Sequence, residues 1–138
     1  MAAIRHQISI AAPTRAVWRA LTTEEGVKSW WVDEARIDAR DGGRIVFTSE
    51  DDEGEPLEER GMFHELRPTR RIEIRWDKVG SSPTAGSTLV FSLARSGSET
   101  RLALVHRGTE VFEDEEARSA LDKGWRQALR ALRSHLED

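Results

Sequence analysis

Residues 113–137 read EDEEARSALDKGWRQALRALRSHLE, and the spacing of their apolar residues largely determines the architecture of the chain. Its apolar residues recur every three or four positions, which is the spacing of one face of an α-helix. They are Ala117, Leu121, Trp125, Ala128, Leu132 and Leu136, with Gly124 and Leu129 widening the stripe. The acidic residues at 113–116 suit the positive end of the helix dipole. We therefore expect an amphipathic helix of about six turns over residues 113–137, whose apolar face needs a partner.

The chain before this helix shows the two-residue period of β-strands. Residues 100–106 place Thr100, Leu102, Leu104 and His106 on one face, and the interleaved residues on the other. Similar segments occur at 4–10, 35–38, 44–48, 61–66, 72–76 and 89–93, separated by turns that include Asp41-Gly42-Gly43, the Ser/Pro/Gly loop at 80–86 and Ser96-Gly97-Ser98. Pro13 at a first helical position and Thr22-x-x-Glu25 as a capping box predict two short helices after the first strand.

These elements predict one α+β domain over residues 1–138. A long helix cannot bury its apolar stripe alone, and an antiparallel sheet with one wet face cannot bury its other face alone. The economical arrangement is a curved antiparallel sheet of about six to seven strands wrapped around the long C-terminal helix.

Composition excludes several classes of function. The chain has no cysteine, which excludes disulfides, thiolate metal sites and a cysteine nucleophile. A net charge of −4 argues against a general nucleic-acid surface, and the acidic run at 49–59 fits a solvated hairpin tip. No apolar run approaches the roughly 20 residues of a membrane span, and no signal peptide is recognisable, so we expect a cytoplasmic protein. We find no metal-ligand spacing and no nucleotide fingerprint, and we expect neither a metal nor a cofactor.

Five tryptophans are the most informative residues for function. Aromatic rings often simply fill a core, but between two apolar faces they can also form the wall of a small-molecule cavity. The candidate ligand-binding residues are Trp30, Trp31, Phe63, Trp76, Phe91, Leu104, His106, Leu121, Trp125 and Leu129. Trp30 and Trp31 cannot both face the core in an extended chain, and the sequence does not tell which one does.

His106 is the polar residue that stands out, because it shares a strand face with Leu102 and Leu104. A cavity-facing imidazole could orient a ligand or act as an acid or base near neutral pH. The alternative is a structural histidine whose nitrogens are satisfied by neighbouring groups. We assign no catalytic residue from the sequence.

Family motifs occur in order along the whole chain. They are Ile8-x-Ile10-Ala-Ala-Pro13, Val17-Trp18, Trp30-Trp31, Asp41-Gly42-Gly43, Pro68-x-Arg70-Arg71-Ile72, Leu102-x-Leu104-x-His106-x-Gly108 and Gly124-Trp125. This pattern resembles the SRPBCC, or START-like, helix-grip superfamily, and within it the AHSA branch, the homologues of the C-terminal domain of the heat-shock-protein-90 ATPase activator. The resemblance implies a sheet that grips the C-terminal helix, with a deep cavity between them.

The resemblance does not imply one activity, because relatives bind lipids, hormones or polyketides and some catalyse cyclisation or hydrolysis. We expect a non-catalytic binder of a hydrophobic or amphipathic small molecule, lipid-like or aromatic. The alternatives are a co-chaperone-like regulator of a heat-shock-protein-90-type ATPase, and a cyclase or hydrolase that uses the same cavity. The sequence allows either a monomer or a homodimer.

Overall fold

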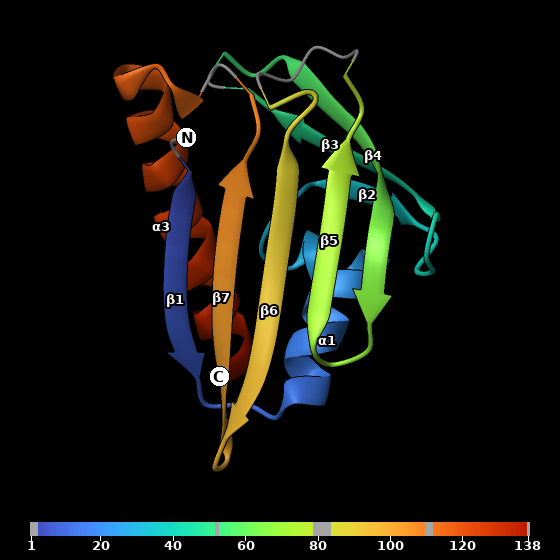
Figure 1. The fold of residues 1–138 in the computed structure, drawn as a ribbon, viewed down its shortest axis with the longest axis vertical. Helices are drawn as coiled ribbons and strands as arrows, with labels where there is room; N and C mark the ends of the chain where they lie inside the picture. The colour runs from blue at the N-terminus through green and yellow to red at the C-terminus, as the bar shows by residue number, and fades with distance from the viewer. Residues whose placement is uncertain (1–2, 52, 79–83, 110–111, 138) are drawn as a thin grey trace.

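A computed structural model describes residues 3–51, 53–78, 84–109 and 112–137. It contains one antiparallel sheet, two short helices after the first strand and a long C-terminal helix, as expected (Figure 1). The elements are β1 (Ile4–Ile10), α1 (Thr14–Thr22), α2 (Glu24–Lys28), β2 (Glu34–Ile37), β3 (Arg44–Glu50), β4 (Pro56–Arg67), β5 (Arg71–Trp76), β6 (Thr88–Ser96), β7 (Glu99–Arg107) and α3 (Glu115–Glu137). The predicted loop at 80–86 lies largely outside the described residues.

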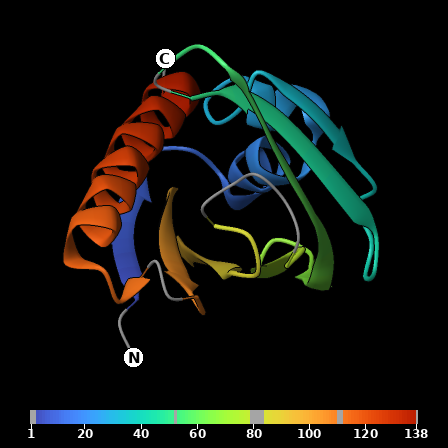
Figure 2. The same cartoon turned by 90° about the horizontal axis from the view of Figure 1, so that it is seen from above.

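The sheet has seven strands in the order β1-β7-β6-β5-β4-β3-β2. Seen from above, it curves, with α3 along one side of the concave face and α1 and α2 at the other (Figure 2). The predicted helix-grip fold is therefore confirmed. Cross-strand neighbours form rows on this inner face: Phe63, Ile74, Leu89 and His106 occupy one row, and Leu66, Ile72, Phe91 and Leu104 the next.

Two predicted helix starts are wrong by one residue. Pro13 has extended backbone angles and precedes α1 instead of occupying its first turn. Thr23, not Thr22, caps α2, and its hydroxyl accepts a hydrogen bond from the Gly26 backbone N–H at 3.0 Å. Thr22 is instead the last residue of α1 and donates its hydroxyl proton to the Trp18 carbonyl. Two neighbouring threonines offer the same capping chemistry, so the sequence pattern alone could not choose between them.

Strand β4 begins at Pro56, five residues before the strand that we expected at 61–66. Its register shifts between Phe63 and Glu65, where a bulge interrupts the pairing with β5. His64 lies at this irregularity and is exposed, and because of the bulge the two-residue period alone does not give the face on which it lies. The backbone N–H of Leu66 beyond the bulge donates to the Asp41 carboxylate at 2.8 Å.

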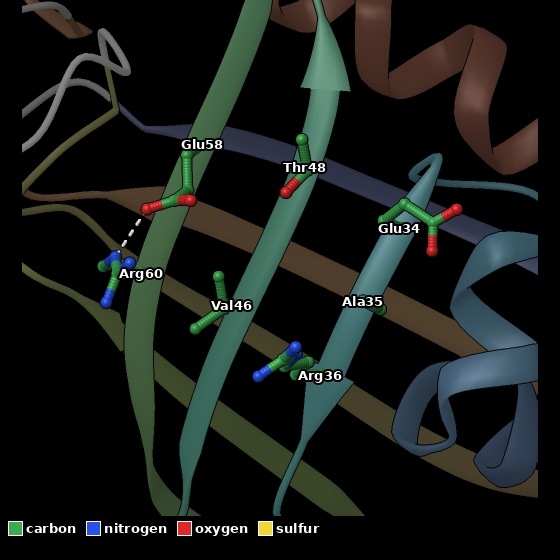
Figure 3. Close-up of a pocket in the computed structure, with 7 residues that line it drawn as sticks. All are labelled: Glu34, Ala35, Arg36, Val46, Thr48, Glu58 and Arg60. Atoms are coloured by element: carbon green, nitrogen blue, oxygen red, sulfur yellow. Dashed lines mark hydrogen bonds and ion pairs between the residues drawn. The ribbon is translucent and has the colours of Figure 1, made fainter.

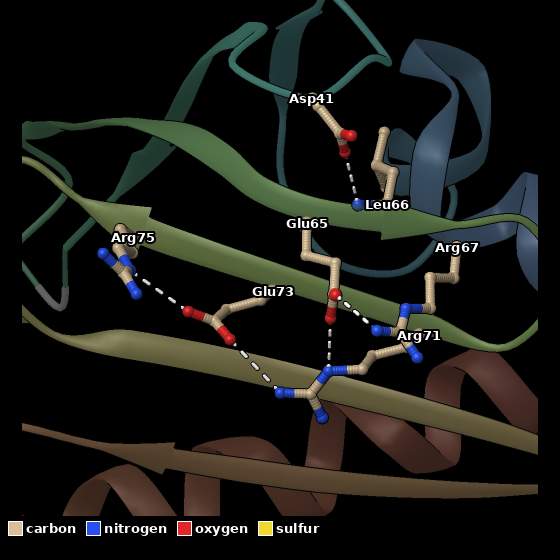
Figure 4. Close-up of polar contacts among 7 residues, drawn as sticks. All are labelled: Asp41, Glu65, Leu66, Arg67, Arg71, Glu73 and Arg75. Carbon is tan, nitrogen blue, oxygen red and sulfur yellow. Dashed lines mark hydrogen bonds and ion pairs between the residues drawn. The ribbon is translucent and has the colours of Figure 1, made fainter.

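The outer face of β4 and β5 carries a chain of ion pairs (Figure 4). Arg71 bridges Glu65 and Glu73, and Arg75 donates to the other oxygen of Glu73. Burial by itself raises the pKa of Glu73, but the hydrogen bond from Arg75 and the nearby positive charges leave that pKa below its ordinary value. This face is thus held by paired charges, while the apolar residues face α3.

Gly124 differs from our expectation that it widens the buried stripe of α3. It is exposed, and a Cβ built on it would meet nothing within 4 Å. Close packing therefore does not explain this glycine, and nothing else in the structure does.

We expect Gly124→Ala to stabilise the protein by about 1 kcal/mol, because glycine in a helix interior costs about that much relative to alanine. Urea unfolding followed by circular dichroism measures the change. A loss of stability would contradict the open surroundings that the structure gives this position.

Among the residues that the structure describes, no helix is long and apolar enough to cross a membrane.

Candidate functional site

An aromatic cluster lies between the inner face of the sheet and α3. It consists of Trp31, Phe47, Trp76, Phe91 and Trp125, which come from the segment after α2 and from β3, β5, β6 and α3. Neighbouring ring centroids are 4.8 to 6.1 Å apart. These are the distances of edge-to-face and tilted aromatic contacts, which stabilise beyond simple burial. Sheet and helix are therefore joined by rings from five separate segments.

The two adjacent tryptophans have different roles. Trp30 is buried, and its indole N–H donates to the Ala20 carbonyl at 2.8 Å, which ties it to α1. Trp31 is only partly buried, yet its ring contacts Phe47, Phe91 and Trp125 as well as Trp30. Trp30 thus anchors the segment, and Trp31 is the partly exposed member of the cluster.

His106 lies beside this cluster, with both ring nitrogens engaged. Its Nδ1 is 3.0 Å from the indole nitrogen of Trp125, and its Nε2 is 2.8 Å from the hydroxyl of Ser87. An indole N–H can only donate, so Nδ1 is the acceptor and the neutral ring carries its proton on Nε2. His106 therefore donates to the Ser87 oxygen, and three polar side chains, from β7, from α3 and from the residue just before β6, form one chain.

Burial keeps His106 neutral, because it lowers the pKa of the imidazole from 6.5 to about 4. The ring also packs edge-on against Phe112 and Trp125. With both nitrogens bonded to protein groups, this imidazole is not placed to exchange a proton with a ligand. The geometry supports the structural alternative for His106.

A second polar pair lies at the same end of the inner face. Thr84 is buried and donates its hydroxyl proton to Glu59 at 2.6 Å. Glu59 lies opposite Phe47 in the β3–β4 pairing, so both side chains belong to the inner face. We call Glu59, Thr84, Ser87 and His106 the polar end of the site.

Trp76 joins the polar end to the aromatic cluster, and its position depends on Gly61. The two residues are paired across β4 and β5, and a Cβ on Gly61 would lie 2.7 Å from both Cε3 of Trp76 and the Arg75 carbonyl oxygen. Only glycine lets the indole lie this close to β4. The Trp76 indole nitrogen is buried, and no hydrogen-bond partner is found for it among the described residues.

Most of the other candidate residues lie around the cluster. Phe63, Leu104 and Leu129 are buried in the same core, and Leu121 packs against it partly exposed. Four residues of the site are not among those predicted from the sequence: Phe47, Glu59, Thr84 and Ser87. The alternation of Ile45 and Phe47 with Val46 and Thr48 could have identified Phe47, but nothing local in the sequence indicates that the hydroxyl of Ser87 meets His106.

His6, on the edge strand β1, is partly buried. It lies between β1 and α3, and its Nε2 is 2.8 Å from a carboxylate oxygen of Asp122, an ion-pair distance without hydrogen-bond alignment. Asp122 also pairs with Arg126 one turn further along α3. This contact fixes the long helix against the edge strand.

A separate surface groove of about 460 Å³ lies on the outer face of β2, β3 and β4 (Figure 3). Its lining is mainly polar and charged: Glu34, Ala35, Arg36, Val46, Thr48, Glu58 and Arg60. Val46 and Thr48 alternate with the buried Ile45 and Phe47, so the groove is on the side of the sheet away from the aromatic cluster. Within the described parts of the chain, no group of three or more His, Cys, Asp or Glu side chains could hold a metal ion.

Comparisons with solved structures find the same fold in several proteins. Protein NE0264 from Nitrosomonas europaea superposes with a TM-score of 0.81 at 22% identity, over 96% of this chain and 92% of that one. The Aha1 dimer from Colwellia psychrerythraea superposes with a TM-score of 0.81 at 23% identity, over 99% of this chain and 97% of that one. CalU16 from Micromonospora echinospora superposes with a TM-score of 0.74 at 26% identity, over 94% of this chain and 73% of that one.

Among curated proteins, no significant match is found. The sequence itself matches the family described as activator of Hsp90 ATPase homolog 1-like protein over residues 11–137, nearly its whole length. Because this match spans nearly the whole chain and the structure has the helix-grip fold, the chain belongs to the family of activator of Hsp90 ATPase homolog 1-like proteins.

Proposed function

We propose that this protein binds a hydrophobic or amphipathic small molecule between the sheet and α3, against the aromatic cluster. The observation that carries the proposal is the cluster itself, in which rings from five segments meet and Trp31 stays partly exposed. Apolar walls with a few polar groups at one end are typical of small-molecule sites. The polar end supplies those groups, and the ten residues identified from the sequence are proposed to line the site.

The test is the affinity for a flat hydrocarbon, 2-isopropenylnaphthalene, measured by isothermal titration calorimetry. We expect saturable binding with one molecule per chain, and we expect Trp31→Ala to weaken it about tenfold, because one aromatic contact contributes about 0.5–1.5 kcal/mol and burial of the ring adds to this.

Trp18→Ala is the matched control, because Trp18 is a half-buried tryptophan on α1, outside the aromatic cluster. It should leave the affinity unchanged. If the unmodified protein binds neither this hydrocarbon nor its ketone analogue, 2-acetylnaphthalene, the proposal is contradicted. Tighter binding by Trp31→Ala also contradicts it, since the ring would then fill the space that the ligand was proposed to occupy.

The family description favours a second candidate function, stimulation of a heat-shock-protein-90-type ATPase. An ATPase assay with the purified chaperone tests it directly, and an unchanged rate at saturating protein would remove it. The geometry argues against a cyclase or hydrolase in which His106 acts as the acid or base, because both ring nitrogens of His106 are bonded within the protein.

A further inference from the structure

Two buried hydrogen-bond donors beside or within the polar end have no acceptor among the described residues. The first is the indole N–H of Trp76, a side chain that is 4% exposed. The second follows from the tautomer of His106. Because the imidazole donates its Nε2 proton to the Ser87 oxygen, the hydroxyl proton of Ser87 must point elsewhere, and no acceptor for it is found among the described residues. Ser87 is 1% exposed.

The two residues that carry these donors are neighbours. The backbone N–H of Trp76 donates to the Ser87 carbonyl at 2.9 Å, so the two residues face each other across β5 and the start of β6. Trp76 shares its strand face with Ile72 and Ile74, and Ser87 shares its face with Leu89 and Phe91, so both side chains belong to the inner face. A buried donor without an acceptor costs about 1–3 kcal/mol, and two side by side are unusual in a native protein.

From this pair we infer that the bound molecule carries an oxygen acceptor that receives hydrogen bonds from Trp76 Nε1 and Ser87 Oγ, while its apolar body contacts the aromatic cluster. The inference rests on the proposed function and specifies its ligand class. Glu59 lies on the same inner face in the adjacent strand. Its carboxylate disfavours a second negative charge, so the acceptor is a neutral carbonyl, ether or hydroxyl oxygen and not a carboxylate.

The placement of Trp76 supports this assignment. Because Gly61 has no side chain, the indole packs directly on the backbone of β4, which fixes the ring against the sheet. Ser87 is fixed by His106, which is in turn held by Trp125. Both donors are therefore presented by rigid elements, which keeps the cost of ordering them on binding low.

Three probes of nearly equal shape test the inference: 2-acetylnaphthalene, 2-isopropenylnaphthalene and 2-naphthoate. The ketone and the hydrocarbon differ only in an oxygen that replaces a methylene group. We expect the ketone to bind about tenfold more tightly than the hydrocarbon, as two satisfied donors allow, and the carboxylate to bind more weakly than the ketone. In a ¹⁵N-labelled sample, the indole N–H resonance of Trp76 should move further downfield with the ketone than with the hydrocarbon.

Trp76→Phe keeps a ring in place but removes the N–H, and it should reduce the preference for the ketone to about threefold. Ser87→Ala should do the same, and Ser87→Thr, which keeps the hydroxyl, should restore the preference. Trp18→Phe is the matched control and should leave the tenfold preference intact. Dispersed amide spectra of each variant establish that it is folded.

Equal affinity of the unmodified protein for the ketone and the hydrocarbon overturns the inference. A buried water that already satisfies both donors would give this result, so the inference fails in that case too. A ketone preference that survives Trp76→Phe and Ser87→Ala also overturns it. Tighter binding of the carboxylate refutes a neutral acceptor. If neither the hydrocarbon nor the ketone binds, the proposed function itself fails, so the two failures are distinguishable.

Discussion

Trp125→Ala is expected to lower the free energy of unfolding by about 4 kcal/mol, the largest loss that we predict for a single substitution in this chain. Trp125 is buried and contacts Trp31 at 5.4 Å and Phe91 at 6.1 Å between ring centroids. Its removal leaves a cavity between sheet and α3. It also removes the donor to His106 Nδ1, which becomes a buried acceptor without a partner.

Trp125→Phe reduces the first contribution and keeps the second, because it retains an aromatic ring but removes the N–H together with part of the indole. We expect it to cost about 2–3 kcal/mol, of which one unsatisfied buried group accounts for about 1–2 kcal/mol and the smaller ring for the rest. Urea unfolding at pH 7.5, followed by far-ultraviolet circular dichroism, measures both variants. A cost below 1 kcal/mol for Trp125→Ala would mean that α3 does not depend on this ring for its attachment to the sheet.

The fold could be predicted from the sequence because its determinants are local and periodic. The stripe of α3 and the alternation from Thr100 to His106 each specify one apolar face, and two such faces have few ways to be buried together. Even so, the start of β4 at Pro56 was missed, since an acidic run does not look like a strand. The first residues of β4 are paired with the β3 residues from Glu50 to Thr48, and this pairing gives them the extended conformation of a strand.

The candidate site was only half predictable, for a physical reason. The position of an aromatic residue in a periodic pattern shows on which face its ring lies, so Trp76, Phe91 and Trp125 could be placed on inner faces. Hydrogen-bond partners between distant segments carry no such pattern. The contact of Ser87 with His106 depends on the β6–β7 register and on the rotamers of both side chains. It therefore becomes apparent only in three dimensions.

The polar end links the stability of the fold to the function that we propose. His106 orients Ser87, and it is itself oriented by Trp125, so one hydrogen-bonded chain attaches α3 to the sheet and presents a donor to the site. This chain requires an unprotonated Nδ1. A protonated imidazole would present an N–H to the indole N–H of Trp125, and two donors cannot form a hydrogen bond.

Acidification should therefore weaken the fold between pH 6.5 and pH 4. The pKa of His106 is about 4 in the folded protein and about 6.5 in the unfolded chain, so the unfolded chain binds the extra proton in this interval. Above pH 6.5 both states are neutral and no stability is lost. As the pH falls toward 4, this residue alone should remove about 3 kcal/mol from the free energy of unfolding.

The control is His106→Gln, whose side chain cannot be protonated but can still accept from Trp125 or donate to Ser87. It should be less stable than the unmodified protein at pH 7.5, and its stability should change much less between pH 6.5 and pH 5. Glu73 does not contribute to the change between pH 6.5 and pH 5. Its pKa in the folded protein lies below the ordinary value, so the stability that its carboxylate contributes is lost at more acidic pH. Urea unfolding curves for both proteins at half-unit steps of pH measure the difference. Parallel curves for the two proteins would show that His106 takes up its proton without opening the link between β7 and α3, and the pH dependence of the fold would then have to arise from other groups.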